Sequence, residues 1–398
     1  MSDAYLDHAA TTPMRPEATE AMAPLLGTVF GNPSGAHRWA RAARRHLDDA
    51  RDIVADALGA DPPEVVFTSG GTEADNLAIA GALGASGGRA LCSAVEHHAV
   101  LEPVRATGGA TVAVDRRGRV DLEVLTSALR ADPQVTLVSA MTANNELGTV
   151  QSIDAVAVTV EEVAPHAVVH TDAVAAAPWL DLSTATAAAD LVSISGHKLG
   201  GPKGTGALVV RRGTSVAPLL RGGGQERDRR SGTPDVAGAV GLAAALAATV
   251  AQRAATVERV EALRRRLVEG LVTTVPDTVV TSPSDPVERT PGTLHLCFSG
   301  VDREALLFLL DRDGVGASWG SSCFSGATET SHVLAALGTP PGLAAGALRL
   351  SLGWCSTEAD VDRALDVVPA AVAHLRGAAR STVTGCPTVG TTATAGVG

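Results

Sequence analysis

Apolar residues recur at helical spacing in the first sixty residues of the chain. They stand three or four positions apart at Ala43, Leu47, Ala50, Val54 and Leu58. This spacing places them on one face of an α-helix, and Gly59, which follows directly, is a typical stop signal. We therefore predict an amphipathic helix over residues 37–58. A second helix is predicted over residues 73–83, directly after a glycine-rich turn.

Seven short apolar runs then follow along the chain. They cover residues 65–68, 90–94, 111–114, 135–140, 168–171, 191–194 and 206–210. Helix-like or loop segments separate most of these runs, and this alternation is typical of a largely parallel sheet covered by helices. The pattern predicts an α/β fold with a mostly parallel, seven-stranded sheet in a large domain.

The pattern changes beyond residue 236. A long Ala/Leu/Arg helix is predicted from there to about residue 272, then a strand over 293–298 and a helix over 303–312. These elements indicate a second, smaller α+β domain. We predict a large domain over residues 15–256, and a small domain made of residues 1–14 and 257–380. The last residues, 381–398, are uncharged and rich in Thr, Gly and Val, so we expect a flexible tail.

The charge balance narrows the classes of function. There are 32 Lys and Arg against 43 Asp and Glu, a net charge of −11. Nucleic-acid binding is not expected, because it requires concentrated basic residues that neutralise phosphates. No membrane association is expected either: no apolar run approaches the roughly 18 uncharged residues that cross a bilayer. The first residues also lack the basic-then-apolar order of a signal peptide.

Five cysteines are present, and none forms a CxxC pair. This number and spacing indicate neither a disulfide framework nor a metal site, and a reducing compartment, the cytoplasm, fits best. For Cys92, Cys297 and Cys355 we expect the ordinary role of a small buried hydrophobic residue. Cys323 differs, because Ser and Gly flank it on both sides. That composition predicts an accessible loop.

Three segments carry candidate chemistry. The turn Ser-Gly-Gly-Thr-Glu at 69–73 opens a helix, so free backbone N–H groups favour an anion such as phosphate. Lys198 follows an apolar strand in a glycine-rich loop, where open α/β sheets bind ligands and where a desolvated amine becomes nucleophilic. Asp172 ends another predicted strand. An ordinary turn, a solvated lysine and a capping aspartate are the structural alternatives.

Lys198 and Asp172 together suit one coenzyme. Pyridoxal phosphate needs a lysine that forms a Schiff base and a carboxylate that keeps the pyridine nitrogen protonated. From residue 6 to about residue 376 the chain resembles the cysteine desulfurases, which belong to class V of the fold type I pyridoxal-phosphate enzymes. The matching stretches are residues 6–13, 30–34, 67–76, 96–100, 144–148, 170–173, 193–198, 222–226, 230–233 and 349–353.

The resemblance implies a role for each matching residue. Lys198 would carry the coenzyme and shuttle the Cα proton, Asp172 would pair with the ring nitrogen, and His97 would stack on the ring and assist proton transfer. The phosphate would be held by Gly71, Thr72, Ser195, His197 and, from a second subunit, Thr233. Arg349 would bind the substrate carboxylate with help from Asn145, which also borders the coenzyme.

The implied reaction removes sulfur from L-cysteine. Cys323 would accept the sulfur as a persulfide, L-alanine would leave, and the persulfide would pass to an acceptor protein or a small-molecule pathway enzyme. The implied assembly is a homodimer.

The chain departs from the family pattern at three positions. Ala175 stands where a glutamine usually contacts the coenzyme, and Trp319 and Trp354 are bulky where small or polar residues are usual. Trp319 would narrow the site or stiffen the Cys323 loop. Two alternatives therefore stay open. One is a class V relative with another outcome: a selenocysteine lyase, a C–S lyase or an aminotransferase acting on a specialised metabolite. The other is a scaffold that only docks a sulfur carrier.

Overall fold

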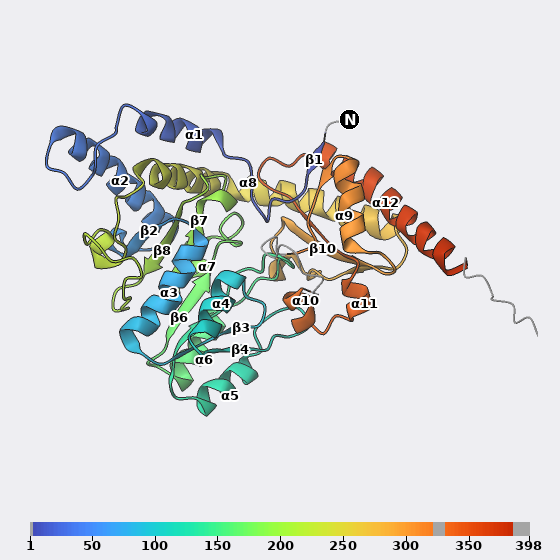
Figure 1. Cartoon of the computed structure of the whole chain (residues 1–398), viewed down its shortest axis with the longest axis horizontal. Helices are drawn as coiled ribbons and strands as arrows, with labels where there is room; N and C mark the ends of the chain where they lie inside the picture. The colour runs from blue at the N-terminus through green and yellow to red at the C-terminus, as the bar shows by residue number, and fades with distance from the viewer. Residues whose placement is uncertain (1–2, 321–330, 385–398) are drawn as a thin grey trace, which may run out of the picture.

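The computed structural model describes residues 3–320 and 331–384. A seven-stranded sheet with the order β2-β8-β7-β6-β5-β3-β4 forms its centre (Figure 1). β8 runs antiparallel to β2 and β7, and the other pairs are parallel. The strands are β2 (Val65–Thr68), β3 (Arg89–Ser93), β4 (Ala110–Val112), β5 (Val135–Ser139), β6 (Val168–Asp172), β7 (Leu191–Ser195) and β8 (Gly206–Val210). The mostly parallel sheet and its seven predicted strands are confirmed.

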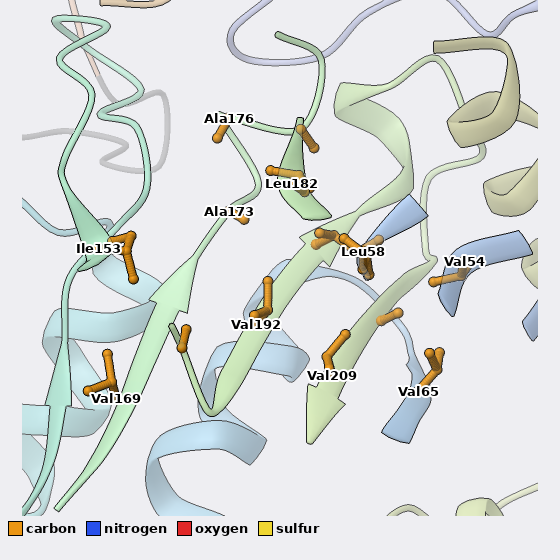
Figure 2. Close-up of a cluster of buried hydrophobic side chains, with 14 of the residues drawn as sticks. Val54, Leu58, Val65, Ile153, Val169, Ala173, Ala176, Leu182, Val192 and Val209 are labelled. Atoms are coloured by element: carbon orange, nitrogen blue, oxygen red, sulfur yellow. The ribbon is translucent and has the colours of Figure 1, made fainter. Parts of the chain in front are cut away.

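Helices cover both faces of this sheet. Neighbouring residues of one strand point to opposite faces, so Val65 and Val66 belong to different core clusters. One face is covered by α3 (Gly71–Ser86) and α4 (His98–Ala106). The other is covered by α2 (Arg38–Ala57), α5 (Leu122–Ala131), α6 (Ile153–Val163) and α7 (Leu182–Ala185). Figure 2 shows this second cluster, in which Val54 and Leu58 of the α2 segment lie near Val65 and Val209.

A smaller region follows the sheet. Its antiparallel strands are β9 (Thr278–Val280), β10 (Thr293–Phe298) and β12 (Ala347–Ser351), with β10 in the middle. β1 (Ala4–Tyr5) pairs in parallel with β11 (Val315–Gly316), so the start of the chain lies in this region. Its helices are α9 (Arg303–Arg312), α10 (His332–Ala336), α11 (Pro341–Ala344) and α12 (Glu358–Thr384). α1 (Pro16–Met22) leads back to the large sheet.

α8 (Val236–Thr274) joins the two regions and is 39 residues long (Figure 1). Leu242 and Leu246 in its first half belong to the core of the large sheet, and Leu267 and Leu271 belong to the core of the smaller one. By length and composition α8 is apolar enough to cross a membrane, so the expectation that no apolar run approaches that length is wrong. It contacts α1, α2 and α12, however, so we interpret it as a core helix. The predicted domain boundary at 256–257 falls inside it.

The C-terminal helix requires one correction. α12 continues to Thr384, so residues 381–384 of the predicted flexible tail are helical. Propagating an existing helix by a few residues adds one backbone hydrogen bond per residue fixed, and the Thr and Val side chains do not prevent it. Residues 385–398 lie outside the described chain. Short 3₁₀ helices complete the structure: η1 (Ala23–Leu26), η2 (Pro62–Glu64), η3 (Gly196–Lys198), η4 (Glu226–Asp228) and η5 (Pro286–Glu288).

Candidate active site

A cavity of about 200 Å³ lies at the carboxyl ends of the parallel strands. In open α/β sheets this is where ligands bind, because the loops that follow the strands converge there. β6 supplies Asp172, β7 supplies Ser195, and η3 supplies His197 and Lys198. The lining includes nine residues predicted from sequence: Gly71, Thr72, His97, Asn145, Asp172, Ser195, His197, Lys198 and Arg349.

The glycine-rich turn places the N-terminus of α3 at the cavity. Gly70 has φ +150°, a value that side-chain-bearing residues rarely adopt, and a Cβ atom on Gly71 would lie 2.9 Å from Val174 Cγ2. Oε2 of Glu73 accepts a hydrogen bond of 2.8 Å from the Ser69 N–H, which fixes the turn. The first N–H groups of a helix have no partner within the helix. With the helix dipole, they make this end suited to an anion.

Lys198 holds its amine at the same cavity. Its Nζ donates hydrogen bonds to the carbonyl oxygens of Ala9 and Ala10, the second of 2.8 Å. The side chain is half-buried, whereas that of Lys203, five residues later in the same loop, is exposed. Lys203 is therefore an ordinary solvated lysine, and this alternative does not apply to Lys198.

Asp172 presents a buried carboxylate at the end of β6. Only 4% of the residue is exposed, and Oδ1 accepts a hydrogen bond of 2.8 Å from the Val174 N–H. Burial and, second, the nearby charge of Asp75 raise the pKa of Asp172 to about 7, while Lys198 opposes the shift. A buried carboxylate of this kind is stabilised by a cation placed beside it.

Two further acids, Asp75 and Glu96, have no role in the predictions from sequence. Burial raises the pKa of Asp75 to about 7 and that of Glu96 to about 8. Asp75 lines the cavity. A signal for it exists in the sequence, since Asp75 is the one charged residue among the buried positions of α3, which are otherwise Gly, Ala, Leu and Ile. Glu96 directly precedes His97 and carries no comparable signal.

The imidazoles at the cavity are uncharged at neutral pH. Burial lowers the pKa values of His97 and His197 to about 4, and the charge of Lys198 acts in the same direction. Nδ1 of His97 accepts a hydrogen bond of 3.1 Å from the Ala99 N–H and so caps α4. The positive charges among the lining residues are then those of Lys198 and Arg349. Two buried acids, Asp75 and Asp172, line the same cavity, and a ligand that brings a cation would stabilise their charged forms.

Arg349 is fully buried in β12, and its guanidinium reaches the cavity from the smaller region. Nη2 lies 2.7 Å from Oδ1 of Asp7, and Nη1 donates a hydrogen bond of 3.0 Å to the carbonyl oxygen of Asn145. The aspartate holds the guanidinium in a fixed orientation. A fixed guanidinium presents its donors in a plane that matches a carboxylate.

The three departures from the family pattern lie at different places. Ala175 borders both the main cavity and a second cavity of about 40 Å³. Trp354 lines the second cavity and stacks against Arg15, whose Cζ is 4.7 Å from the ring centroid. Trp319 lines neither cavity: it packs against a separate cluster that includes Val95 and Cys297, and Cζ of Arg303 lies 4.0 Å from its ring centroid. The expected narrowing of the site by Trp319 is therefore absent from the described lining.

Of the predicted residues that the structure describes, Thr233 is not brought to this cavity. Thr233 lines a separate cavity of about 160 Å³, between the residues around Ser69 and those around Gly204. Cys323 lies outside the described residues. Cys92 and Cys297 are buried, as expected, and burial raises the pKa values of both thiols. Cys355 is half-buried.

The arrangement of an amine, a buried carboxylate and a helix N-terminus around one cavity agrees with comparisons with known proteins. Residues 4–364 match the family described as aminotransferase class-V. An IscS-like cysteine desulfurase of Mycobacterium tuberculosis is 46% identical over 390 residues, covering 94% of this chain and 98% of that protein. The chain belongs to class V, in its cysteine desulfurase branch. Cysteine desulfurase IscS of Dictyoglomus turgidum is 40% identical, covering 94% of this chain and 95% of that one.

Solved structures of class V proteins share the fold. A NifS-like protein superposes with a TM-score of 0.86 and 34% identity, covering 94% of this chain and all of that chain. A protein described as SspA in complex with cysteine superposes with a TM-score of 0.75 and 31% identity, covering 89% of this chain. The fold predicted from sequence is thus confirmed as that of the class V cysteine desulfurases.

The raised pKa values of the buried acids predict how the free energy of unfolding of this class V chain depends on pH when no ligand is added. Carboxyls whose folded pKa is raised stabilise below their unfolded pKa, and this stabilisation is lost as the pH rises through about 7 for Asp75 and Asp172 and about 8 for Glu96. Histidines with lowered pKa values lose their stabilisation only as the pH falls below about 6.5, the ordinary value, so they change the free energy of unfolding little above pH 7. We expect the free energy of unfolding to fall by about 1 kcal/mol between about pH 7 and pH 8. Urea unfolding at several pH values measures it, and a rise would contradict these pKa directions.

Proposed function

We propose that this chain is a pyridoxal-phosphate-dependent cysteine desulfurase. It converts L-cysteine to L-alanine and leaves the sulfur as a persulfide on Cys323. The observation that carries the proposal is the meeting of the Lys198 amine, the buried Asp172 carboxylate and the α3 N-terminus at one cavity. An amine, an acid partner for a ring nitrogen and a phosphate site are the three features that this coenzyme requires.

The residues present fit the coenzyme. Gly71, Thr72, Ser195 and His197 would hold its phosphate at the helix N-terminus, where a Cβ on Gly71 would meet Val174. Asp172 would pair with the ring nitrogen and Lys198 would bind the aldehyde covalently. The buried carboxylate of Asp172 favours a ring nitrogen that carries a proton. When bound, pyridoxal phosphate supplies an electron sink that stabilises negative charge at the substrate Cα.

The residues of the chain then bind and orient the substrate. Arg349, held by Asp7, would bind the substrate carboxylate together with Asn145. The Lys198 amine would take up the Cα proton and return it to the product, and the uncharged imidazole of His97 is able to accept a proton. Lys198 and His97 are both half-buried, which limits the access of water to the proton transfers.

Sulfur leaves through Cys323. Its thiolate attacks the substrate sulfur, the Cβ–S bond breaks, and a new S–S bond forms on Cys323. L-cysteine and one protein thiol thus give L-alanine and one protein persulfide, with no outside oxidant or reductant. The persulfide is then available to an acceptor protein or to an enzyme of a small-molecule pathway. A reducing compartment, the cytoplasm, suits a persulfide carried by a free thiol.

The position of Thr233 supports the proposal of a homodimer. This residue lies in a cavity separate from the active site of its own chain. Three residues just before it, Glu226, Arg227 and Asp228, have positive φ values of 48°, 57° and 63°, which are strained for residues with side chains. The buried ion pair of Glu226 with Arg51, at 2.7 Å, holds this segment in place. Such a fixed segment is able to present Thr233 to the phosphate in a second copy.

The test is the identity of the products. We expect the purified chain, supplied with pyridoxal phosphate and L-cysteine, to release L-alanine and to carry one additional sulfur atom on the peptide that contains Cys323. Amino-acid analysis and mass spectrometry measure both. Pyruvate would indicate a C–S lyase, a keto acid that retains sulfur would indicate an aminotransferase, and preference for selenocysteine would indicate a lyase for that substrate. An absorption spectrum unchanged by L-cysteine would indicate a scaffold.

A further inference from the structure

Asp75 is a buried acid at the cavity to which the proposed reaction assigns no role. It lies in the second turn of α3, only 1% of it is exposed, and it lines the cavity beside Asp172. Its Oδ1 atom is buried and makes no hydrogen bond within the described part of the chain. A buried carboxylate oxygen without a partner costs free energy, so its retention calls for an explanation.

The groups behind Asp75 do not neutralise it. Nε2 of His170 lies 3.5 Å from Oδ1, but burial lowers the pKa of His170 to about 4, so this ring is uncharged at neutral pH. The two ring nitrogens of His170 are instead engaged by hydroxyls, with Ser139 Oγ at 2.8 Å and Ser193 Oγ at 3.0 Å. Ser193 also forms a hydrogen bond with Asp75, which favours its charged form. None of these neighbours carries a positive charge at neutral pH. A cation that stabilises the Asp75 carboxylate would therefore have to lie on the cavity side.

The remaining groups around Asp75 and Asp172 are acids, neutral rings and two cations. Glu96 carries a raised pKa partly because of the charges of Asp172 and Asp75. Lys198 lowers the pKa of Asp172, and Arg349 is already paired with Asp7. The titratable and charged groups that line the cavity with Asp75 are His97, Asp172, His197, Lys198 and Arg349. When Lys198 is bound covalently to an aldehyde, its nitrogen is no longer a free ammonium group that could stabilise the two carboxylates.

We propose that Asp75 is a positioning residue that acts through Asp172, as a second buried carboxylate that keeps the coenzyme's ring nitrogen protonated. This inference rests on the proposed function, since it requires pyridoxal phosphate in the cavity. The physical reason is that a second negative charge makes the Asp172 carboxylate a stronger base. The ring nitrogen proton is then attracted by two buried charges in place of one. Asp75 itself does not touch the reacting atoms.

The test is the protonation of that nitrogen in the variant Asp75→Asn. The amide keeps the shape of the side chain and a hydrogen bond to Ser193, and it removes only the charge. The holoenzyme is reconstituted with pyridoxal phosphate labelled with ¹⁵N in the ring, and the ¹⁵N chemical shift is followed against pH. We expect the nitrogen to lose its proton at a pH about one unit lower in the variant, roughly a tenfold loss of proton affinity.

Asp190→Asn is the matched control. Its carboxylate accepts a hydrogen bond of 2.8 Å from the Val169 N–H, in the same sheet, but it does not line the cavity. We expect the parent titration in this variant. Should Asp75→Asn fail to fold, Ser193→Ala replaces it: loss of the Ser193 hydrogen bond keeps Asp75 protonated to a higher pH, so a smaller shift in the same direction is expected.

The three possible results are distinguishable. An identical ¹⁵N titration in the parent and in Asp75→Asn, both with coenzyme bound, would overturn the role of Asp75 and leave the proposed function intact. Failure of the parent chain to bind the coenzyme would instead overturn the proposed function, and this inference with it. A shift seen in Asp75→Asn and absent from Asp190→Asn supports the inference, because a general loss of stability would not move the proton affinity of one ring atom.

Discussion

Replacing Lys198 with alanine is expected to abolish covalent attachment of pyridoxal phosphate and to lower L-alanine formation by at least about 10³-fold. The variant removes both the nucleophilic amine and the group that moves the Cα proton. Asp172, Ser195 and His197 stay in place, so the coenzyme should still bind without a covalent bond. Borohydride reduction followed by mass spectrometry of the peptide measures attachment. Amino-acid analysis measures turnover.

Lys203 provides the matched control, because it is a lysine of the same loop with an exposed side chain. Lys203→Ala should retain the reducible attachment and the parent rate. If the coenzyme remains covalently bound to Lys198→Ala, another amine serves as its anchor, and the assignment of Lys198 is wrong. The pair of variants therefore separates a specific role of one amine from a general effect of positive charge in the loop.

The large sheet was predictable because its signal is local. Short apolar runs separated by helical segments mark strands buried on both faces, and all seven runs correspond to strands. The long helix after residue 236 was predictable for the same reason. That α8 serves both cores could not be predicted, because its apolar positions do not say which region each of them meets. The helical start of the tail was missed because Ser, Thr and Val disfavour helices only weakly.

The site shows where local sequence is not enough. Gly71, Lys198 and Asp172 stand in motifs whose chemistry is visible in a few residues, and the fold brings them to one cavity. The ion pair between Asp7 and Arg349 joins residues 342 positions apart, so no spacing rule reveals it. The surroundings of Asp75, in helix α3, are set by a histidine and a serine from two strands of the sheet. Tertiary packing determines which charged groups lie beside one another, so only the structure shows these contacts.

Replacing Cys323 with alanine should stop sulfur transfer while leaving the coenzyme site unchanged. The covalent coenzyme and its spectral response to L-cysteine depend on Lys198, Asp172 and Arg349, all of which are retained. No cysteine is among the described residues that line the cavity, so without the Cys323 thiolate we expect persulfide formation to be undetectable and L-alanine formation to fall by at least about 10²-fold. Alkylation of protein persulfides followed by peptide mass spectrometry, with parallel amino-acid analysis, measures both quantities.

Cys355→Ala tests whether any accessible thiol would suffice. Cys355 is half-buried, and burial raises the pKa of its thiol, so little thiolate is present at neutral pH. We expect this variant to match the parent in both persulfide and L-alanine. Alanine release at the parent rate from Cys323→Ala would show that sulfur leaves without a protein persulfide, and the reaction would then be a direct release of sulfide. A persulfide found on Cys355 in the parent would relocate the acceptor to the groove that this residue lines with Arg259 and Arg266.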